Sequence, residues 1–280
     1  MLALLLLLQA CSAVRLAYNQ ADTILYWRLD SYADLTAEQA PRVRESLAQF
    51  LAWHRRSQLP LYAEQLQLIR PRLAEALTPE QACMLFEQLR ATVEPPLLDP
   101  ANWPLLWLPG ELSAEQLRHI ERKQKITDAE WRQDWLEGTP VQRLDRRFDK
   151  ALERAEMLYG GLDEPQRAAL REGLLQASSF DAQRSYAERL RRQQELRQAL
   201  RRIHDDRLGA EPARQLLQRY LEHALSPSDP AQQRYTQALI REGCATFARL
   251  HNATTPAQRE RAMRTLKGYE DDFRALAAQR

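Results

Sequence analysis

The sequence predicts an all-α protein, an antiparallel multi-helix bundle of about eleven helices. Only 8 of the 280 residues are Gly, which disfavours parallel α/β folds, because those folds use Gly in phosphate loops and tight turns. Leu, Ala, Gln, Glu and Arg dominate the composition, and all of them favour helices. A helix-start signal also recurs along the chain. These three observations agree on the fold class.

The composition is that of a globular protein with a genuine core. Hydrophobic residues make up 44% of the chain and charged residues 28%, which excludes wholesale disorder. The formal net charge is +2, from 40 basic and 38 acidic residues. Because no strong global field results, nucleic acid is not an expected partner.

The first dozen residues predict a lipid anchor. Five leucines, Leu4 to Leu8, are followed by Gln9, Ala10 and Cys11, a pattern that resembles the cleavage site of bacterial lipoproteins. The apolar run is too short to cross a bilayer, which takes about 20 residues. We therefore expect a signal peptide over 1–10, lipid on the Cys11 thiol and a tether over 11–21. Resemblance to enterobacterial lipoproteins, in which Asp after the lipidated Cys retains the protein in the inner membrane, implies that Ser12 favours the outer membrane, with the protein facing the periplasm. The leader has no Lys or Arg, so Met1 need not be the true start.

The recurring helix-start signal is a capping box. Ser, Thr or Asp at the N-cap accepts a hydrogen bond from the backbone three residues on, and a Gln there reaches back to the cap's own N–H. The pairs are Thr36/Gln39, Thr78/Gln81, Ser113/Gln116, Thr139/Gln142, Asp163/Gln166, Asp229/Gln232 and Thr255/Gln258, with Thr127/Glu130 weaker. Their irregular spacing argues against a fixed-period solenoid.

The first half of the chain predicts four helices within a helical domain over 22–280. A helix from Asp22 to about Asp34 should be largely buried, because apolar residues wrap around its circumference. Helices over 37–57 and 60–76 follow. Thr78 should cap the next one, with its apolar stripe facing inward. The apolar residues concerned are Ile24, Leu25, Trp27, Leu29 and Tyr32 in the first helix and Cys83, Phe86 and Leu89 in the last.

A Pro-rich segment over 94–112 interrupts the helices and is a possible domain seam. Its five prolines should prevent a regular helix. It carries Trp103 and Trp107, which could form an exposed patch for membrane or client contact or fold back as a plug. We favour the plug, because soluble chains rarely leave two tryptophans in water.

Helices resume at Ser113, with a break expected near Ile126–Thr127. Others run over 139–159, 163–177 and 181–208, and the last ones start at Glu211, Asp229 and Thr255. The 181–208 helix is rich in arginine and includes the candidate interaction residues Arg191, Arg192 and Arg201. They could face an anionic lipid or an acidic partner, but Arg/Glu pairing on a solvated helix is the favoured interpretation.

No motif for catalysis or for a cofactor is present. None of the five histidines, including His54, lies at a helical spacing typical of metal ligands. The best local cluster, His204-Asp205-Asp206, is typical of a solvated helix end. We therefore predict no catalytic residue, no metal and no cofactor. Cys83 and Cys244 could pair in an oxidising compartment, but two buried free thiols are equally plausible.

Two resemblances bear on function. The segments Tyr18-Asn19-Gln20-Ala21-Asp22, Trp27–Tyr32 and Trp53–Tyr62 resemble an uncharacterised family of proteobacterial outer-membrane lipoproteins, which carries Tyr-Asn-x-Ala-Asp after its lipidated Cys. That resemblance implies a lipoprotein and no known activity. Leu35-Thr36-x-x-Gln39 and Leu77-Thr78-x-x-Gln81 are similar to motifs of small periplasmic chaperones of the Spy and CpxP type. Those are helical cradles that hold clients without ATP. A capping box after an apolar residue gives the same pattern, so we favour convergence.

The functional expectation is a lipid-anchored, non-catalytic binding or scaffold protein of the cell envelope, with an envelope protein as partner. The alternatives are an ATP-independent chaperone and a hydrolase without a recognisable motif. A hydrolase would need a deep pocket where a carboxylate meets His54 or His204.

Overall fold

The computed structural model describes residues 13–99 and 102–279. Within these residues the chain forms thirteen α-helices, twelve of them seven residues or longer, and no strand. The predicted all-α class is confirmed. The lipidation site expected at Cys11 and the signal peptide over 1–10 lie outside the described residues.

The helices follow one another with short connections. In chain order they are α1 (Ala13–Asn19), α2 (Ala21–Ala33), α3 (Gln39–Ser57), α4 (Leu59–Ile69), the 3₁₀ helix η2 (Arg70–Ala74), α5 (Pro79–Leu98), α6 (Leu108–Glu111), α7 (Ala114–Trp135), α8 (Pro140–Tyr159), α9 (Glu164–Gln176), α10 (Ala182–Asp205), α11 (Ala210–Leu225), α12 (Pro230–Ala253) and α13 (Pro256–Ala277).

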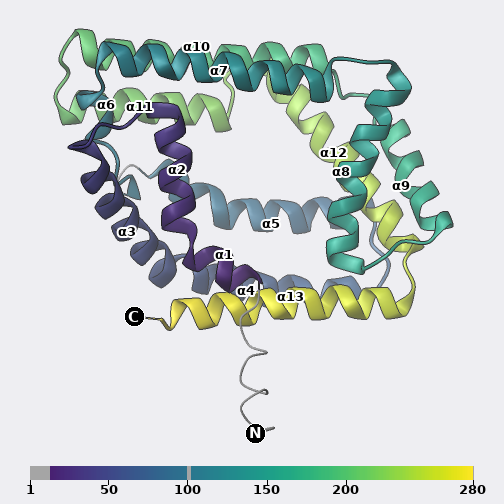
Figure 1. The fold of residues 1–280 in the computed structure, drawn as a ribbon. Helices are drawn as coiled ribbons and strands as arrows, with labels where there is room; N and C mark the ends of the chain where they lie inside the picture. Colours follow the sequence, from purple (N-terminus) through teal and green to yellow (C-terminus); the bar gives the residue numbers. More distant parts are fainter. Residues whose placement is uncertain (1–12, 100–101, 280) are drawn as a thin grey trace, which may run out of the picture.

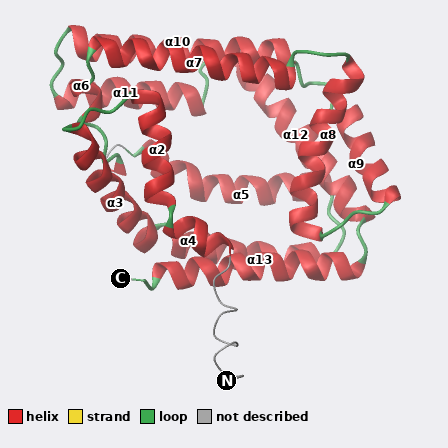
Figure 2. Ribbon diagram, in the orientation of Figure 1, coloured by secondary structure: helices red, strands yellow, loops and turns green. Residues whose placement is uncertain are grey.

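The helices surround a four-sided frame that α5 crosses (Figures 1 and 2). In the view of Figure 1, α7 and α10 form the upper side, α2 and α3 the left, α4 and α13 the lower side, and α8 and α9 the right. Helix α5 packs against α4 and α12, and α4 packs along α13. Elements from the first third of the chain therefore pack on the last two helices.

Two separate apolar cores support the frame. One is shared by α2, α3, α6, α7 and α10 and includes Val43, Leu108 and Ile120. The other is shared by η2, α8, α9, α12 and α13 and includes Tyr159 and Leu170. A small third cluster of Ala82, Cys244 and Ala248 joins α5 to α12. The seam suggested at 94–112 stays a prediction.

Capping boxes close at six of the seven main predicted helix starts. Reciprocal hydrogen bonds join cap and Gln at Thr36, Thr78, Ser113, Thr139, Asp163 and Thr255. At the seventh, Asp229, the carboxylate accepts from the N–H groups of Ala231 and Gln232 and supplies the cap alone. Six of these helices begin at the residue that the sequence predicts, and α3 begins two residues later than predicted, at Gln39.

Four of the six boxes also dock in pairs, which the sequence did not indicate. At the starts of α3 and α7, Gln116 Nε2 donates to Gln39 Oε1 at 2.7 Å and to the Asp34 carbonyl at 3.0 Å. Gln39 Nε2 in turn donates to the Glu111 carbonyl at 2.9 Å. Both glutamines are buried. The side-chain amide of each one therefore has two roles, because its oxygen caps its own helix and its nitrogen bonds the segment before the other helix.

The starts of α9 and α13 repeat this arrangement at the opposite corner of the frame (Figure 1). Gln166 Nε2 donates to Gln258 Oε1 at 2.6 Å and to the Ala253 carbonyl at 3.2 Å, and Gln258 Nε2 donates to the Gly161 carbonyl at 3.0 Å. In both pairs the accepting carbonyl lies two residues before the Ser, Thr or Asp that opens the capping box of the opposite helix. We call the two sites the paired corners.

The N-terminal helix expected from Asp22 to Asp34 was wrong in its burial and its start. Part of the tether expected over 11–21 is also helical, because α1 covers Ala13–Asn19 and packs on α13. Helix α2 is a separate helix with an open outer face, where Ile24 is 57% and Trp27 68% exposed. Only one side of α2 meets α3 and α7, so apolar residues around the whole circumference cannot all be covered.

Two other boundaries differ from the prediction. Helix α7 runs unbroken through Ile126–Thr127, because the Thr127 hydroxyl donates to the Gln124 carbonyl in its own helix and caps nothing. Helix α5 continues through Pro95 and Pro96 to Leu98. These prolines lie in its last turn, where few further backbone bonds are lost, and the Pro95 carbonyl still accepts from the Asp99 N–H.

Candidate functional site: an apolar groove beside a disulfide

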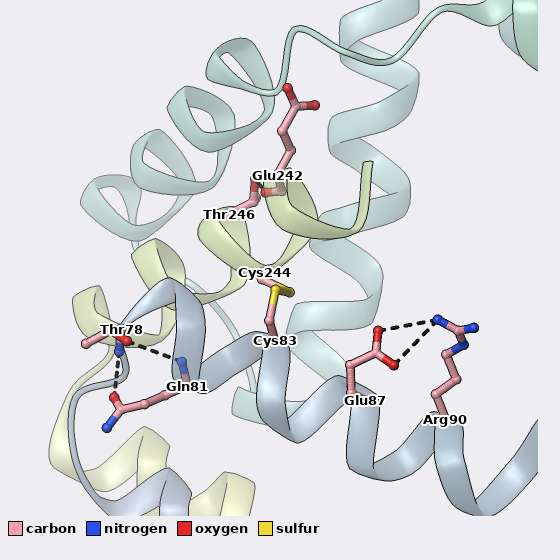
Figure 3. The surroundings of a disulfide bond; sticks show 8 residues. All are labelled: Thr78, Gln81, Cys83, Glu87, Arg90, Glu242, Cys244 and Thr246. Atoms are coloured by element: carbon pink, nitrogen blue, oxygen red, sulfur yellow. Dashed lines mark hydrogen bonds and ion pairs between the residues drawn. A yellow bond between two sulfur atoms is a disulfide. The ribbon is translucent and has the colours of Figure 1, made fainter. Parts of the chain in front are cut away.

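A disulfide between Cys83 and Cys244 fixes α5 to α12 (Figure 3). The two Cα atoms are 5.2 Å apart, and 161 positions separate the cysteines in the sequence. Of the two alternatives that the sequence allowed, a disulfide or two free thiols, the structure contains the disulfide. It indicates an oxidising compartment, because such bonds do not persist among cytosolic reductants.

An apolar groove lies beside this disulfide, between η2, α5 and α12. Its volume is about 600 Å³, within the range of ligand pockets in proteins. Nearly every residue that lines it is apolar: Ile69, Leu73, Ala82, Leu85, Phe86, Leu89, Leu158, Thr236, Leu239, Ile240, Gly243, Cys244, Phe247 and Leu266. We call this cavity the main groove.

The main groove explains why α5 departs from the predicted inward stripe. Phe86 is 44% and Leu89 38% exposed, although the sequence places them on the same helical face as Ala82 and Leu85. The apolar stripe exists on one face of α5. Its Ala82 end is buried against α12, whereas Phe86 and Leu89 lie at the open rim of the main groove. The prediction that Phe86 and Leu89 face inward was therefore wrong for the outer half of the stripe.

A second apolar cavity of about 570 Å³ lies between α8, α9 and α12. We call it the inner cavity. It shares Leu158 of α8 and Leu239, Gly243 and Phe247 of α12 with the main groove, so the two cavities are adjacent. A Cβ atom at Gly243 would meet no atom within 4 Å, so this glycine leaves space between the two cavities. At Gly173, by contrast, a Cβ would lie 3.2 Å from the Thr246 Cα, because α9 and α12 approach closely there.

The tryptophans of the Pro-rich segment fold back onto the frame, as the plug interpretation predicts for Trp107. Its Nε1 donates to Ser46 Oγ at 3.1 Å, and the Arg42 guanidinium lies 3.8 Å from its ring centroid. Trp107 also packs on the core shared by α2, α3 and α7. Trp103 is half-buried. The segment therefore offers no broad exposed aromatic patch.

The arginine-rich helix α10 pairs its charges with nearby carboxylates. Arg191 bridges Glu188 and Glu195 at 2.8 and 2.9 Å. Arg192 lies 3.8 Å from Glu188, and Arg201 pairs with Glu121 of α7 at 3.0 Å. The hydrogen bond from Arg191 lowers the pKa of Glu188. These contacts agree with the Arg/Glu pairing interpretation.

The histidines lie apart from both cavities and make structural contacts. His54 is bound by the Tyr18 hydroxyl at 2.8 Å among aromatic neighbours, and burial lowers its pKa. His204 contacts Asp205, the next residue, at the surface. Neither histidine lines the main groove or the inner cavity. Across residues 13–99 and 102–279, no group of three or more His, Cys, Asp or Glu is placed to hold a metal ion.

His251 is fully buried between Tyr159 and the backbone of Glu75. Its Nε2 lies 2.7 Å from the Glu75 carbonyl, and its Nδ1 lies 2.8 Å from the Tyr159 hydroxyl. A carbonyl can only accept, so Nε2 carries the proton and Nδ1 accepts from the hydroxyl. Burial lowers the pKa of His251 and raises that of Tyr159. The neutral ring fits this site.

Residues 31–229 match a family of unknown function, DUF6279. This match spans more than half of the chain. The chain belongs to this family. No curated protein and no solved structure matches it. Among the described residues of this family member, no helix has both the length and the apolar content that a membrane span requires.

Proposed function

We propose that this DUF6279 protein is a lipid-anchored, non-catalytic binding protein of the cell envelope that holds an apolar group in the main groove. The observation that carries the proposal is the groove itself. Its lining is nearly all apolar, and two large side chains, Phe86 and Leu89, stay open at its rim. Exposed apolar surface of this kind is typical of binding sites.

The location within the envelope is supported by two independent features. The lipid anchor expected at Cys11 would hold the chain at the outer membrane on its periplasmic side. The disulfide between Cys83 and Cys244 needs an oxidising compartment, and the periplasm is one. The near-neutral charge continues to disfavour nucleic acid as a partner.

Photocrosslinking in intact cells tests this proposal. A photoreactive residue at Leu89, on the rim of the main groove, should capture its occupant. The matched control is Met84, which lies on the same helix and is 57% exposed but lines neither cavity. We expect specific adducts at Leu89 and few at Met84. Equal capture at both positions would contradict the proposal.

The mass of the adduct separates the candidate functions. A single protein partner would indicate a scaffold, and many unfolded envelope proteins would indicate a chaperone. A small amphiphile would indicate a carrier. A chaperone is the second candidate function, because the exposed apolar groove could hold an unfolded client. The client would then bind the main groove and not the segment of Trp103 and Trp107.

A further inference from the structure

Arg147 carries a positive charge into the wall of the inner cavity. It projects from α8 and lines the cavity together with Ala151 and Leu158 of the same helix. Its guanidinium lies 4.8 Å from the Phe180 ring centroid. Burial lowers the pKa of Arg147, although the guanidinium stays charged at any physiological pH.

Arg147 has no ion pair of its own within residues 13–99 and 102–279, whereas Arg171 of the neighbouring helix α9 pairs with Asp145 of α8 at 2.6 Å. The nearby carboxylate, Glu242, is bound by Ser179 through the backbone N–H at 3.0 Å and the hydroxyl at 2.7 Å. Glu242 acts on Arg147 only through its charge. A half-buried guanidinium with five N–H donors is thus left without a carboxylate partner.

The charges that line the inner cavity favour an anion. Arg154 lies on the same face of α8 and lines the same cavity, so two arginines face one engaged carboxylate. Beyond them, the linings of both cavities are mainly apolar, and both include Gly243, where a Cβ would meet no atom within 4 Å. One end of this space suits a negative headgroup and the rest suits a hydrocarbon chain.

We propose that the two cavities hold a long-chain carboxylate, with its headgroup on Arg147 and its chain running past Gly243 into the main groove. The planar fork of a guanidinium matches a carboxylate with two parallel hydrogen bonds. Each methylene that leaves water contributes about 0.8 kcal/mol, so the chain supplies affinity and Arg147 supplies selectivity. This inference rests on the proposed function, because it names the ligand class of the same groove.

The test compares two photoactivatable probes of equal chain length, a palmitate analogue and the corresponding alcohol. Both are added to membranes that contain the full chain, and the labelled peptides are mapped. We expect labelling of α5 and α12, with the carboxylate favoured about tenfold, as a charged hydrogen-bonded pair implies. In Arg147→Gln this preference should disappear while labelling by the alcohol persists.

Two further variants make the result decisive. Arg241→Gln removes an equal charge from an exposed position on α12 that lines neither cavity, and it should keep the preference. Gly243→Leu should fill the junction and reduce labelling by both probes. Equal labelling by the two probes in the unmodified chain would overturn the carboxylate inference and leave the groove as a binding site. Absence of groove labelling by either probe would overturn this inference alone, because the proposed function is decided separately by capture at Leu89 against Met84.

Discussion

The paired corner at Gln166 and Gln258 and the single start of α8 at Thr139 contain the same local motif in different surroundings. At Thr139, the partner Gln142 is exposed and serves only its own helix. At the corner, Gln166 is 2% exposed and its amide also bonds Gln258 and a carbonyl of the opposite loop. The same box therefore starts a helix in one place and joins two distant segments in the other.

The residue before the cap differs between the paired corners and the start of α8. Leu35, Leu112, Leu162 and Thr254 precede the four boxes at the paired corners, and Gly138 precedes the box at Thr139. Leu112 and Leu162 are buried, so they hold the box against the core. Leu77 precedes the box at Thr78, where Asn252 of α12 bonds both its N–H and its carbonyl. The Leu-Thr-x-x-Gln pattern thus has a structural explanation that needs no chaperone activity.

The largest expected effect is at the second paired corner. Gln166→Ala removes a cap bond and two bonds across the corner, those from Gln166 Nε2 to Gln258 Oε1 and to the Ala253 carbonyl. We expect a loss of about 3 kcal/mol in the free energy of unfolding. Urea denaturation measures it, with Gln142→Ala as the control. A loss no larger than that of the control would mean that the pairing contributes nothing.

The first paired corner allows the coupling itself to be measured. A double-mutant cycle of Gln39→Ala and Gln116→Ala should give an interaction free energy of about 1.5 kcal/mol, because the two amides are in direct contact. The same cycle on Gln39 and Gln142, which do not touch, should give additive effects. Additivity in both cycles would show that the corners are two independent caps.

At the single box, Thr139→Ala should cost about 1 kcal/mol, since only one side-chain cap bond is lost. Thr78→Ala should cost a similar amount, because Asn252 holds the loop through the backbone of Leu77 and not through Thr78. Thermal melts of both variants check this. Unchanged melting temperatures would mean that these helices do not depend on their caps.

The smallest expected effect is a pH dependence near the second paired corner. Burial lowers the pKa of His251 in the folded state, so the unfolded chain takes up a proton first as the pH falls. Stability should therefore be complete above a pH of about 6.5 and decline below it, by at most about 0.7 kcal/mol from this group between pH 7 and 6. His251→Gln should flatten the profile relative to His204→Gln, a surface control. Equal slopes in the two variants would remove His251 as the cause.

Much of the fold could be read from local signals. The capping boxes locate helix starts because the bonds involved lie within four residues, and they were correct at Thr36, Thr78, Ser113, Thr139, Asp163 and Thr255. What failed was burial. Trp27, Phe86 and Leu89 are apolar at positions that a helical stripe would bury, but burial depends on which distant helix covers them.

The candidate site could not be predicted from the sequence, because it also depends on which distant helices pack together. The main groove brings η2 and α5 together with α12, which lies more than 130 positions later in the chain, and no motif marks it. The sequence held one ambiguous signal for the site, the cysteines Cys83 and Cys244, which were equally compatible with a disulfide and with two free thiols. The sequence around Arg147 contains no signal of a binding role, because its lack of an ion pair becomes apparent only when the positions of the neighbouring helices are known.

The disulfide between Cys83 and Cys244 also imposes an order of assembly. Cys83 of α5 is synthesised 161 positions before Cys244, its disulfide partner. In the same way α4 and η2 meet α13 only late, as in the contact of Arg70 of η2 with Glu270. In a chain that crosses a membrane from its N-terminus, α4 and α5 would wait uncovered until the last two helices arrive. Closing such a long loop is slow. Under the proposed envelope location, helper proteins that shield Phe86 and Leu89 during export, and an oxidant that acts afterwards, would therefore set the yield of the folded protein.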